Sequence, residues 1–247
     1  MQEIVNQLQY YPFINYICIA VNQIDCFSER MFPMKYDTVI FDLDGTLLNT
    51  LDDLRDSLND ALIQNGYSTR SLEEVRRFVG NGVKNLVRRS LPETSSEEEV
   101  IKIMDIFLVH YKNNMQNKTR PYNGIMELLL DLNRYNYKLA IVSNKYDPAV
   151  KALAKTYFGN LFPVAIGEAP DIKRKPAPDS IFTAVKELGS ELSNTILVGD
   201  SETDVQTAKN AGIPCIGVTW GFRNREVLRS EGADFLIDTP KEILTII

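Results

Sequence analysis

Short runs of apolar and β-branched residues, each ended by polar residues or glycine, are the feature that most constrains the fold of this chain. Such runs occur at residues 36–41, 138–142, 195–198, 213–218 and 234–237. Their length and low polarity are typical of strands buried on both faces of a parallel sheet. Helical spacing of apolar residues lies between them, as in Ile125-Leu128-Leu129-Leu132. Strands alternating with helices predict right-handed crossovers and a doubly wound, Rossmann-like parallel-sheet core of the α/β class.

Residues 51–120 interrupt this alternation, because they contain amphipathic segments but no strand run. The segments are Leu51–Leu62, Leu72–Val79, Val83–Leu91 and Val100–Tyr111. Ser95 and Ser96 precede Glu98 and Glu99 by three residues, which is the spacing of a capping box at a helix start. We therefore predict an α-helical cap over residues 51–120, inserted into a catalytic core of residues 35–50 and 121–247. This cap follows the first strand directly, so it can fold over that strand's end.

Residues 1–34 show neither clean alternation nor helical periodicity, and we expect them to be an N-terminal extension that the fold does not need. Their most apolar stretch, Tyr11–Val21, is interrupted by Asn15 and lacks a preceding basic segment. We therefore expect neither a membrane span nor a signal peptide.

The composition narrows the classes of partner. With a net charge of −6 and no run of Lys or Arg, the chain is a poor candidate for binding nucleic acid or an anionic membrane. The cysteines, Cys18, Cys26 and Cys215, are irregularly spaced, which predicts free thiols in a reducing compartment. We expect a cytoplasmic location.

Polar residues follow three of the strand runs. They are Asp42 and Asp44 after the first, Ser143 and Asn144 after the second, and Asp200 and Asp204 after the third, with Lys175 in an intervening loop. Ligands of open parallel sheets bind beyond the carboxyl ends of the strands, so we expect these side chains in one cleft.

Carboxylates crowded in this way repel one another unless a cation lies among them. Mg²⁺ prefers a few protein carboxylates, waters and a substrate phosphate, which matches this set. Ser143 can donate a hydrogen bond to a phosphoryl oxygen, and Lys175 offers a positive charge to the same group. The combination indicates phosphoryl transfer on a small-molecule phosphate ester.

Four sequence blocks resemble the motifs of the haloacid dehalogenase superfamily, specifically its phosphatases with a helical cap inserted after the first strand. The blocks are Phe41–Leu47, Val142-Ser143-Asn144, Lys175-Pro176 and Gly199–Asp204. Their order and spacing fit the superfamily over residues 36–247. The resemblance implies a Mg²⁺-dependent phosphoric monoester hydrolase.

The resemblance also implies a role for each motif residue. Asp42 would attack phosphorus and become an aspartyl phosphate, and Asp44 would act as general acid and then general base. The side chains that would bind phosphate are Ser143, Asn144 and Lys175. Mg²⁺ would be held by the Asp42 and Asp200 carboxylates and the Asp44 backbone carbonyl, with Asp204 and Thr46 in support.

Within the superfamily, the cap loop Phe78–Val83 is similar to that of phosphoglycolate phosphatases. Asn49–Leu54 and Thr219-Trp220-Gly221 are similar to that group as well. Gly80, Asn81 and Gly82 would then contact the leaving group, although the same residues are also compatible with an ordinary turn between helices. A phosphosugar mutase like β-phosphoglucomutase, a nucleotidase and a pyrophosphatase of the same superfamily are alternatives. A non-enzymatic binding protein is disfavoured by the intact motifs.

Overall fold

The structure is a computed structural model, and it describes residues 35–80 and 82–247. The expected extension at residues 1–34 and the cap residue Asn81 lie outside the described residues. Among the described residues, no helix combines the length and the apolar character needed to cross a membrane.

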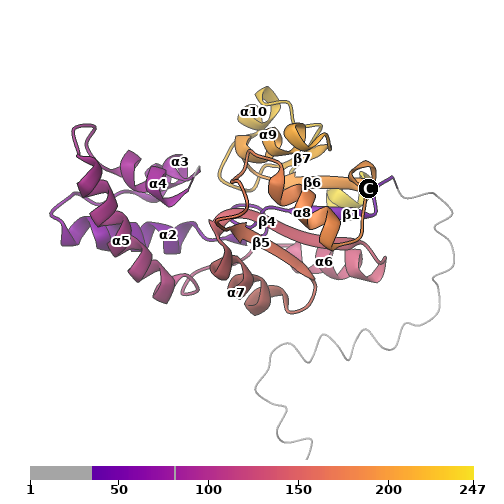
Figure 1. The fold of residues 1–247 in the computed structure, drawn as a ribbon, viewed down its shortest axis with the longest axis horizontal. Helices are drawn as coiled ribbons and strands as arrows, with labels where there is room; N and C mark the ends of the chain where they lie inside the picture. Colours follow the sequence, from indigo (N-terminus) through magenta and orange to yellow (C-terminus); the bar gives the residue numbers. More distant parts are fainter. Residues whose placement is uncertain (1–34, 81) are drawn as a thin grey trace, which may run out of the picture. The chain divides into compact units, whose positions relative to one another are not determined.

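A six-stranded parallel sheet forms the centre of the fold, in the order β5-β4-β1-β6-β7-β8 (Figure 1). The strands are β1 (Thr38–Phe41), β4 (Lys138–Tyr146), β5 (Val164–Glu168), β6 (Thr195–Gly199), β7 (Cys215–Val218) and β8 (Phe235–Ile237). Strand β1 lies in the middle of the sheet; β4 and then β5 lie outward on one side of it, and β6, β7 and β8 follow on the other side. This order confirms the predicted doubly wound α/β core.

Two features of the sheet differ from the sequence prediction. The edge strand β5 was not among the predicted runs, because its sequence Val-Ala-Ile-Gly-Glu is short and contains a small residue and a glycine. Strand β4 does not end at Val142 but continues to Tyr146 after a shift in register, so Ser143 and Asn144 lie within its last part. The polar residues Ser143 and Asn144 therefore mark where the apolar run ends, but the extended backbone continues past them.

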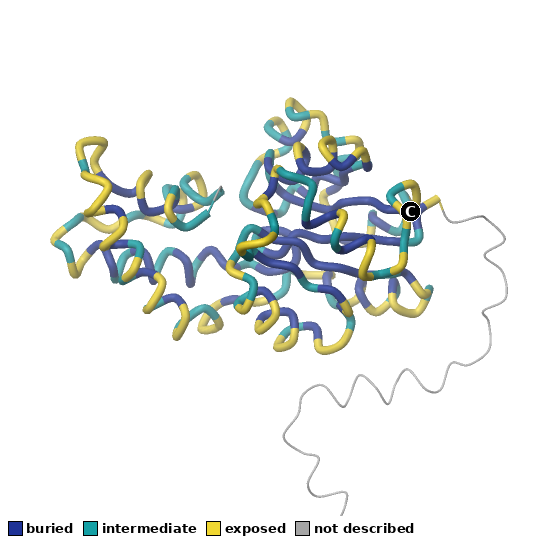
Figure 2. The backbone as a smooth tube through the Cα atoms, in the orientation of Figure 1, coloured by how far each residue is buried: buried dark blue, intermediate teal, exposed yellow. Residues whose placement is uncertain are grey.

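Alternate residues of the strands point into two separate hydrophobic clusters. In β1, Val39 and Phe41 pack with one set of helices and Ile40 with the other. The first set is α6 (Ile125–Arg134) and α7 (Asp147–Phe158), and the second is α8 (Asp179–Glu187), α9 (Glu202–Ala211) and α10 (Arg225–Ser230). Figure 2 shows the strands buried, with exposed residues on the outer sides of the helices. Burial on both faces explains why the strand sequences are almost continuously apolar.

The inserted cap consists of helices with a third hydrophobic cluster of their own. The helices are α2 (Leu51–Gln64), α3 (Leu72–Phe78), α4 (Val83–Ser90) and α5 (Glu97–Asn114). Helix α5 begins with a capping box between Ser96 and Glu99, as its sequence predicts. The apolar residues of the cap therefore pack mainly with one another, and the central sheet has hydrophobic clusters of its own.

The two connections between cap and core are tied to each other. Strand β2 (Leu48–Asn49) pairs antiparallel with β3 (Arg120–Pro121). The buried Asp53 carboxylate accepts hydrogen bonds from the backbone N–H groups of Lys118 at 3.0 Å and Thr119 at 2.9 Å. These bonds fix the base of the cap a few residues from Asp44.

Candidate active site

Three aspartates meet at the carboxyl ends of neighbouring strands. Asp42 follows β1, Asp200 follows β6, and Asp204 lies in the first turn of α9. All three are buried, and one carboxylate oxygen from each lies within 4.8 Å of the others. Strand β1 pairs with β4 on one side and β6 on the other, so this is the point at which the direction of winding changes. Such points are the usual ligand sites of open α/β sheets.

The Lys175 ammonium lies inside this cluster. Its Nζ donates to Asp42 Oδ1 at 2.7 Å, to Asp204 Oδ1 at 2.6 Å and to the Val142 carbonyl at 3.1 Å. The other Asp204 oxygen accepts from the Ser201 N–H at 3.1 Å and hydroxyl at 2.6 Å. Both oxygens of Asp204 are therefore engaged in holding the lysine and the start of α9.

The second predicted phosphate-binding pair, Ser143 and Asn144, lies beside Lys175. Asn144 Oδ1 accepts from the Lys175 N–H at 2.8 Å, and its Nδ2 donates to the Lys175 carbonyl at 2.9 Å. This reciprocal pair fixes the loop that carries the lysine. The Ser143 hydroxyl accepts from the Lys145 N–H at 3.3 Å and keeps its own hydrogen to donate.

The Asp200 carboxylate is fixed by two hydrogen bonds and by backbone segments that pass close to it. Its Oδ1 accepts from the Thr46 hydroxyl at 3.1 Å, and its Oδ2 accepts from the Phe222 N–H at 2.7 Å. Gly45 has a φ of +96°, and a Cβ on Gly45 or Gly221 would lie 2.3 Å from an atom of Asp200. Two glycines are therefore required around this one carboxylate. The motif containing Gly45 was predicted, but the contribution of Phe222 comes from a loop distant in sequence.

The cluster is short of positive charge. Burial, together with the charges of Asp204 and Asp44, raises the pKa of Asp42 to about 7, although Lys175 acts in the opposite direction. Burial and the neighbouring Asp42 and Asp204 carboxylates raise the pKa of Asp200 well above its usual range. Burial alone would lower the pKa of Lys175, but Asp204 and Asp42 raise it. One ammonium among three buried carboxylates leaves room for a cation bound by oxygen atoms.

Asp44 has a different partner from the other aspartates. Its carboxylate accepts from Lys145 Nζ, at 2.8 Å to Oδ1 and 3.1 Å to Oδ2. The same ammonium donates to the hydroxyl of Tyr111, in cap helix α5, at 2.7 Å. Neither Lys145 nor Tyr111 was a predicted site residue. The position of Lys145 directly after the motif residue Asn144 was a usable signal, whereas Tyr111 reaches the site only through the packing of the cap.

Core arginines contact the predicted cap turn on both sides of Asn81. Arg223 donates to the carbonyls of Arg76 at 3.1 Å and Val79 at 2.6 Å, and a Cβ on Gly80 would lie 3.0 Å from its guanidinium. A Cβ on Gly82 would overlap the Arg174 guanidinium. The turn therefore lies against the core.

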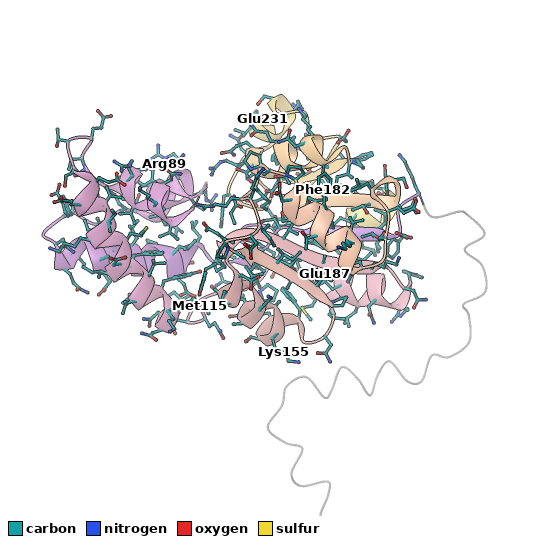
Figure 3. The ribbon with its side chains drawn as sticks, viewed as in Figure 1. Arg89, Met115, Lys155, Phe182, Glu187 and Glu231 are labelled. Carbon is teal, nitrogen blue, oxygen red and sulfur yellow. The ribbon has the colours of Figure 1, made fainter. Side chains whose placement is uncertain are left out.

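The arginines of α4 stay within the cap. Arg89, labelled in Figure 3, donates to the Phe78 carbonyl at 2.8 Å, and Arg88 forms an ion pair with Glu97. Arg89 therefore lies beside the turn from within the cap, whereas Arg223 and Arg174 approach the turn from core loops.

Comparisons with known proteins agree with this geometry. The sequence profile described as haloacid dehalogenase-like hydrolase matches residues 39–218. A curated phosphoglycolate phosphatase from Mesorhizobium japonicum is 34% identical over 202 residues, covering 80% of this chain and 89% of the relative. A crystal structure from Lactobacillus delbrueckii subsp. bulgaricus, assigned as a phosphoglycolate phosphatase, is 36% identical with a TM-score of 0.83, covering 87% of this chain and 99% of that chain. CbbY from Rhodobacter sphaeroides in complex with phosphate is 25% identical with a TM-score of 0.70, covering 84% and 96%.

Proposed function

The chain belongs to the haloacid dehalogenase-like hydrolase family and is a phosphatase, and from this premise we propose that it hydrolyses 2-phosphoglycolate or a close relative through an aspartyl phosphate on Asp42. The observation that carries the proposal is the position of Asp42 at the centre of the sheet. There it contacts Lys175 and lies beside Asp200, with Asp44 two residues further along the chain.

In the first step, an Asp42 oxygen forms a bond to phosphorus while the bond from phosphorus to the ester oxygen breaks. Asp44 gives its proton to the departing oxygen. Charge on the phosphoryl oxygens is stabilised by the Lys175 ammonium and the Ser143 hydroxyl, which lie at the same strand ends. Asn144 contributes by fixing the Lys175 loop.

In the second step, water forms a bond to the phosphorus of the aspartyl phosphate while the bond from phosphorus to the Asp42 oxygen breaks, which restores the Asp42 carboxylate and releases inorganic phosphate. Asp44 now takes the proton from that water, so one carboxyl group serves as acid and then as base. Asp204 keeps Lys175 in place through both steps, because its other oxygen is anchored to Ser201. Covalent catalysis of this kind divides one difficult displacement into two easier ones.

The donor set fits a divalent cation of the Mg²⁺ type. The candidate ligands are the carboxylates of Asp42 and Asp200 and the backbone carbonyl of Asp44, and all are oxygen atoms, which hard cations prefer. The pKa values of Asp42 and Asp200 are both raised first by burial and then by the neighbouring carboxylates, and a bound cation would counter both causes. When bound, Mg²⁺ would neutralise charge on the phosphoryl group during transfer.

The substrate part of the proposal is supported by the relatives. Phosphoglycolate phosphatase is the name of the curated relative from Mesorhizobium japonicum, and that resemblance includes the cap as well as the core. The core motifs would contact the phosphoryl group and, through Asp44, the leaving oxygen that all esters share, so the identity of the ester must depend on other residues around the leaving group.

The test is phosphate release from a panel of phosphate esters by the purified protein with Mg²⁺ and with EDTA. We expect 2-phosphoglycolate to be among the best substrates and EDTA to remove activity. Rapid acid quenching followed by mass spectrometry should find a phosphate adduct on the peptide that contains Asp42. A panel in which no ester is hydrolysed, or a reaction without that adduct, would contradict the proposal.

A further inference from the structure

Lys145 forms a charged centre that the proposed chemistry does not use. It lies in β4 two residues after Ser143, and only 9% of its side chain is exposed. Its ammonium contacts both oxygens of Asp44 and the hydroxyl of Tyr111, and lies 4.7 Å from the centre of the Tyr111 ring. The Asp44 carboxylate offsets the free-energy cost of burying this ammonium, so any event that draws Asp44 away exposes that cost.

The ammonium of Lys145 lies next to the position that the leaving group of the substrate must occupy. In an in-line displacement, the leaving oxygen departs on the side of phosphorus opposite Asp42 and must come within hydrogen-bond distance of Asp44. Since Lys145 Nζ is 2.8 Å from an Asp44 oxygen, a substituent on the carbon next to the leaving oxygen comes within reach of this ammonium. Tyr111 reaches the same place from α5 of the cap.

The charges around Lys145 indicate which kind of substituent would bind there most favourably. In the structure, both oxygens of Asp44 face the ammonium. When Asp44 turns an oxygen toward the leaving group, Lys145 loses part of its counter-ion. A carboxylate on the leaving group replaces that counter-ion, whereas a neutral group leaves the ammonium under-compensated.

Tyr111 supplies a second donor. Its hydroxyl accepts the hydrogen bond from Lys145 and so keeps its own hydrogen. Burial raises the pKa of the Tyr111 hydroxyl to about 12, so the hydrogen is present at neutral pH. Ammonium and hydroxyl together offer two donors to one carboxylate, one from the core and one from the cap.

We propose that Lys145 and Tyr111 form the binding site for the carboxylate of the leaving group, and that they restrict the enzyme to phosphate esters of 2-hydroxy acids. The inference rests on the proposed function, because it requires hydrolysis at Asp42. The inference adds to the proposed function the residues that determine selectivity, of which Lys145 belongs to the core and Tyr111 to the cap. Binding of substrate then exchanges the Lys145–Asp44 ion pair for a pair between Lys145 and the substrate, which frees Asp44 to reach the leaving oxygen.

The test compares two esters of nearly equal size, 2-phosphoglycolate and 2-hydroxyethyl phosphate, in which a CH₂OH group replaces the carboxylate. Lys145→Met should lower kcat/KM for 2-phosphoglycolate by about 100-fold and for 2-hydroxyethyl phosphate by less than about tenfold, since only the first loses a buried charge pair with its ligand. Tyr111→Phe, which keeps the ring, should lower kcat/KM about fivefold for 2-phosphoglycolate alone. Lys151→Met, at an exposed lysine of α7 paired with Asp147, is the matched control and should change neither value.

A binding measurement gives a readout besides turnover. In the inactive Asp42→Asn background, calorimetry should find that Lys145→Met weakens binding of 2-phosphoglycolate but leaves binding of 2-hydroxyethyl phosphate unchanged. Equal losses on both esters would overturn the inference, because Lys145 would then act only through Asp44. If Lys145→Met does not fold, Tyr111→Phe decides the question by the same comparison. A wild-type enzyme that prefers 2-phosphoglycolate, but whose Lys145→Met variant keeps that preference, overturns this inference alone, whereas inactivity of the wild type on every ester overturns the proposed function with it.

Discussion

The cleft of the core and the turn of the cap are built in opposite ways. In the cleft, Asp42, Asp200, Asp204 and Lys175 are buried, and each is held by a side chain or backbone group of the core. At the cap turn, Gly80 and Gly82 offer no side chains, and contact with the core is made by Arg223 and Arg174 from outside the cap.

This difference separates two tasks. Phosphoryl transfer needs a nucleophile and charges in fixed positions, whatever the ester, and the hydrogen-bonded side chains of the cleft meet that need. Discrimination between esters needs contacts with the leaving group, and on the proposed function the turn is one of the segments that could supply them. Changes in the cleft should therefore abolish chemistry on every substrate, and changes at the turn should have smaller effects that depend on the substrate.

The largest effect is expected for Asp42→Asn. The neutral amide is a poor nucleophile, so kcat should fall by at least about 10³-fold on all esters. The melting temperature without metal should stay equal or rise, because one of three buried carboxylates has lost its charge. Phosphate release and calorimetric unfolding measure the two quantities. Activity within about tenfold of wild type would contradict the covalent step.

Asp44→Asn should remove proton transfer to the leaving group, a contribution of about 10²–10⁴-fold. The loss should be large for alkyl phosphates and small for aryl phosphates with good leaving groups in the phosphorylation step. Single-turnover kinetics on the two kinds of ester measure this difference. The same loss on both kinds would mean that Asp44 does not act as the acid.

Lys175→Met tests how far the cleft depends on the ammonium that Asp42 and Asp204 share. Asp42 and Asp204 would lose a shared partner in a site where only 4% of the lysine side chain is exposed. Removing one partner of a buried ion pair typically lowers the free energy of unfolding by about 3–5 kcal/mol. Urea unfolding measures the change, with the exposed Lys186→Met as the control that should have no effect. A loss of activity without a loss of stability would mean that the aspartates have another cation.

The smallest effect is expected at the turn. Arg223→Ala removes the hydrogen bonds to the Arg76 and Val79 carbonyls and the ion pair with Glu202. Loss of about 1 kcal/mol of contact free energy corresponds to roughly a fivefold fall in kcat/KM. The fall should differ between esters and spare p-nitrophenyl phosphate. Arg225→Ala, which breaks a pair with Asp238 on the surface, is the matched control. An equal fall in kcat/KM on all esters would contradict the idea that the turn, unlike the cleft, affects substrates differently.

Much of the α/β core could be predicted because local patterns of residues encode its strands and helices. Apolar runs that end in Asp42, Ser143 and Asp200 required parallel strands with polar ends, and parallel strands bring their carboxyl ends to one edge. The cap was predictable from helical spacing and from the Ser96–Glu99 capping box. Strand β5 was missed because an edge strand containing Ala165 and Gly167 lacks the continuous apolar pattern.

Distances and partners within the site could not be predicted in the same way. That Asn144 holds the backbone of Lys175, and that Asp204 binds Lys175 with one oxygen and Ser201 with the other, depends on loops fixed by packing. The contact of Phe222 with Asp200 joins residues 22 positions apart, and sequence spacing gave no sign of it.

The sequence by itself determined the fold class, the order of the motifs and the kind of chemistry, because each follows from residue types at fixed positions on strands and helices. Only the tertiary structure decided which groups lie around Asp44. Lys145 and Tyr111 are 34 residues apart and come from core and cap, and their hydrogen bond joins the last part of β4 to the last turn of α5. A contact of this kind depends on how two separately packed groups of elements meet, and no local pattern of residues encodes that arrangement.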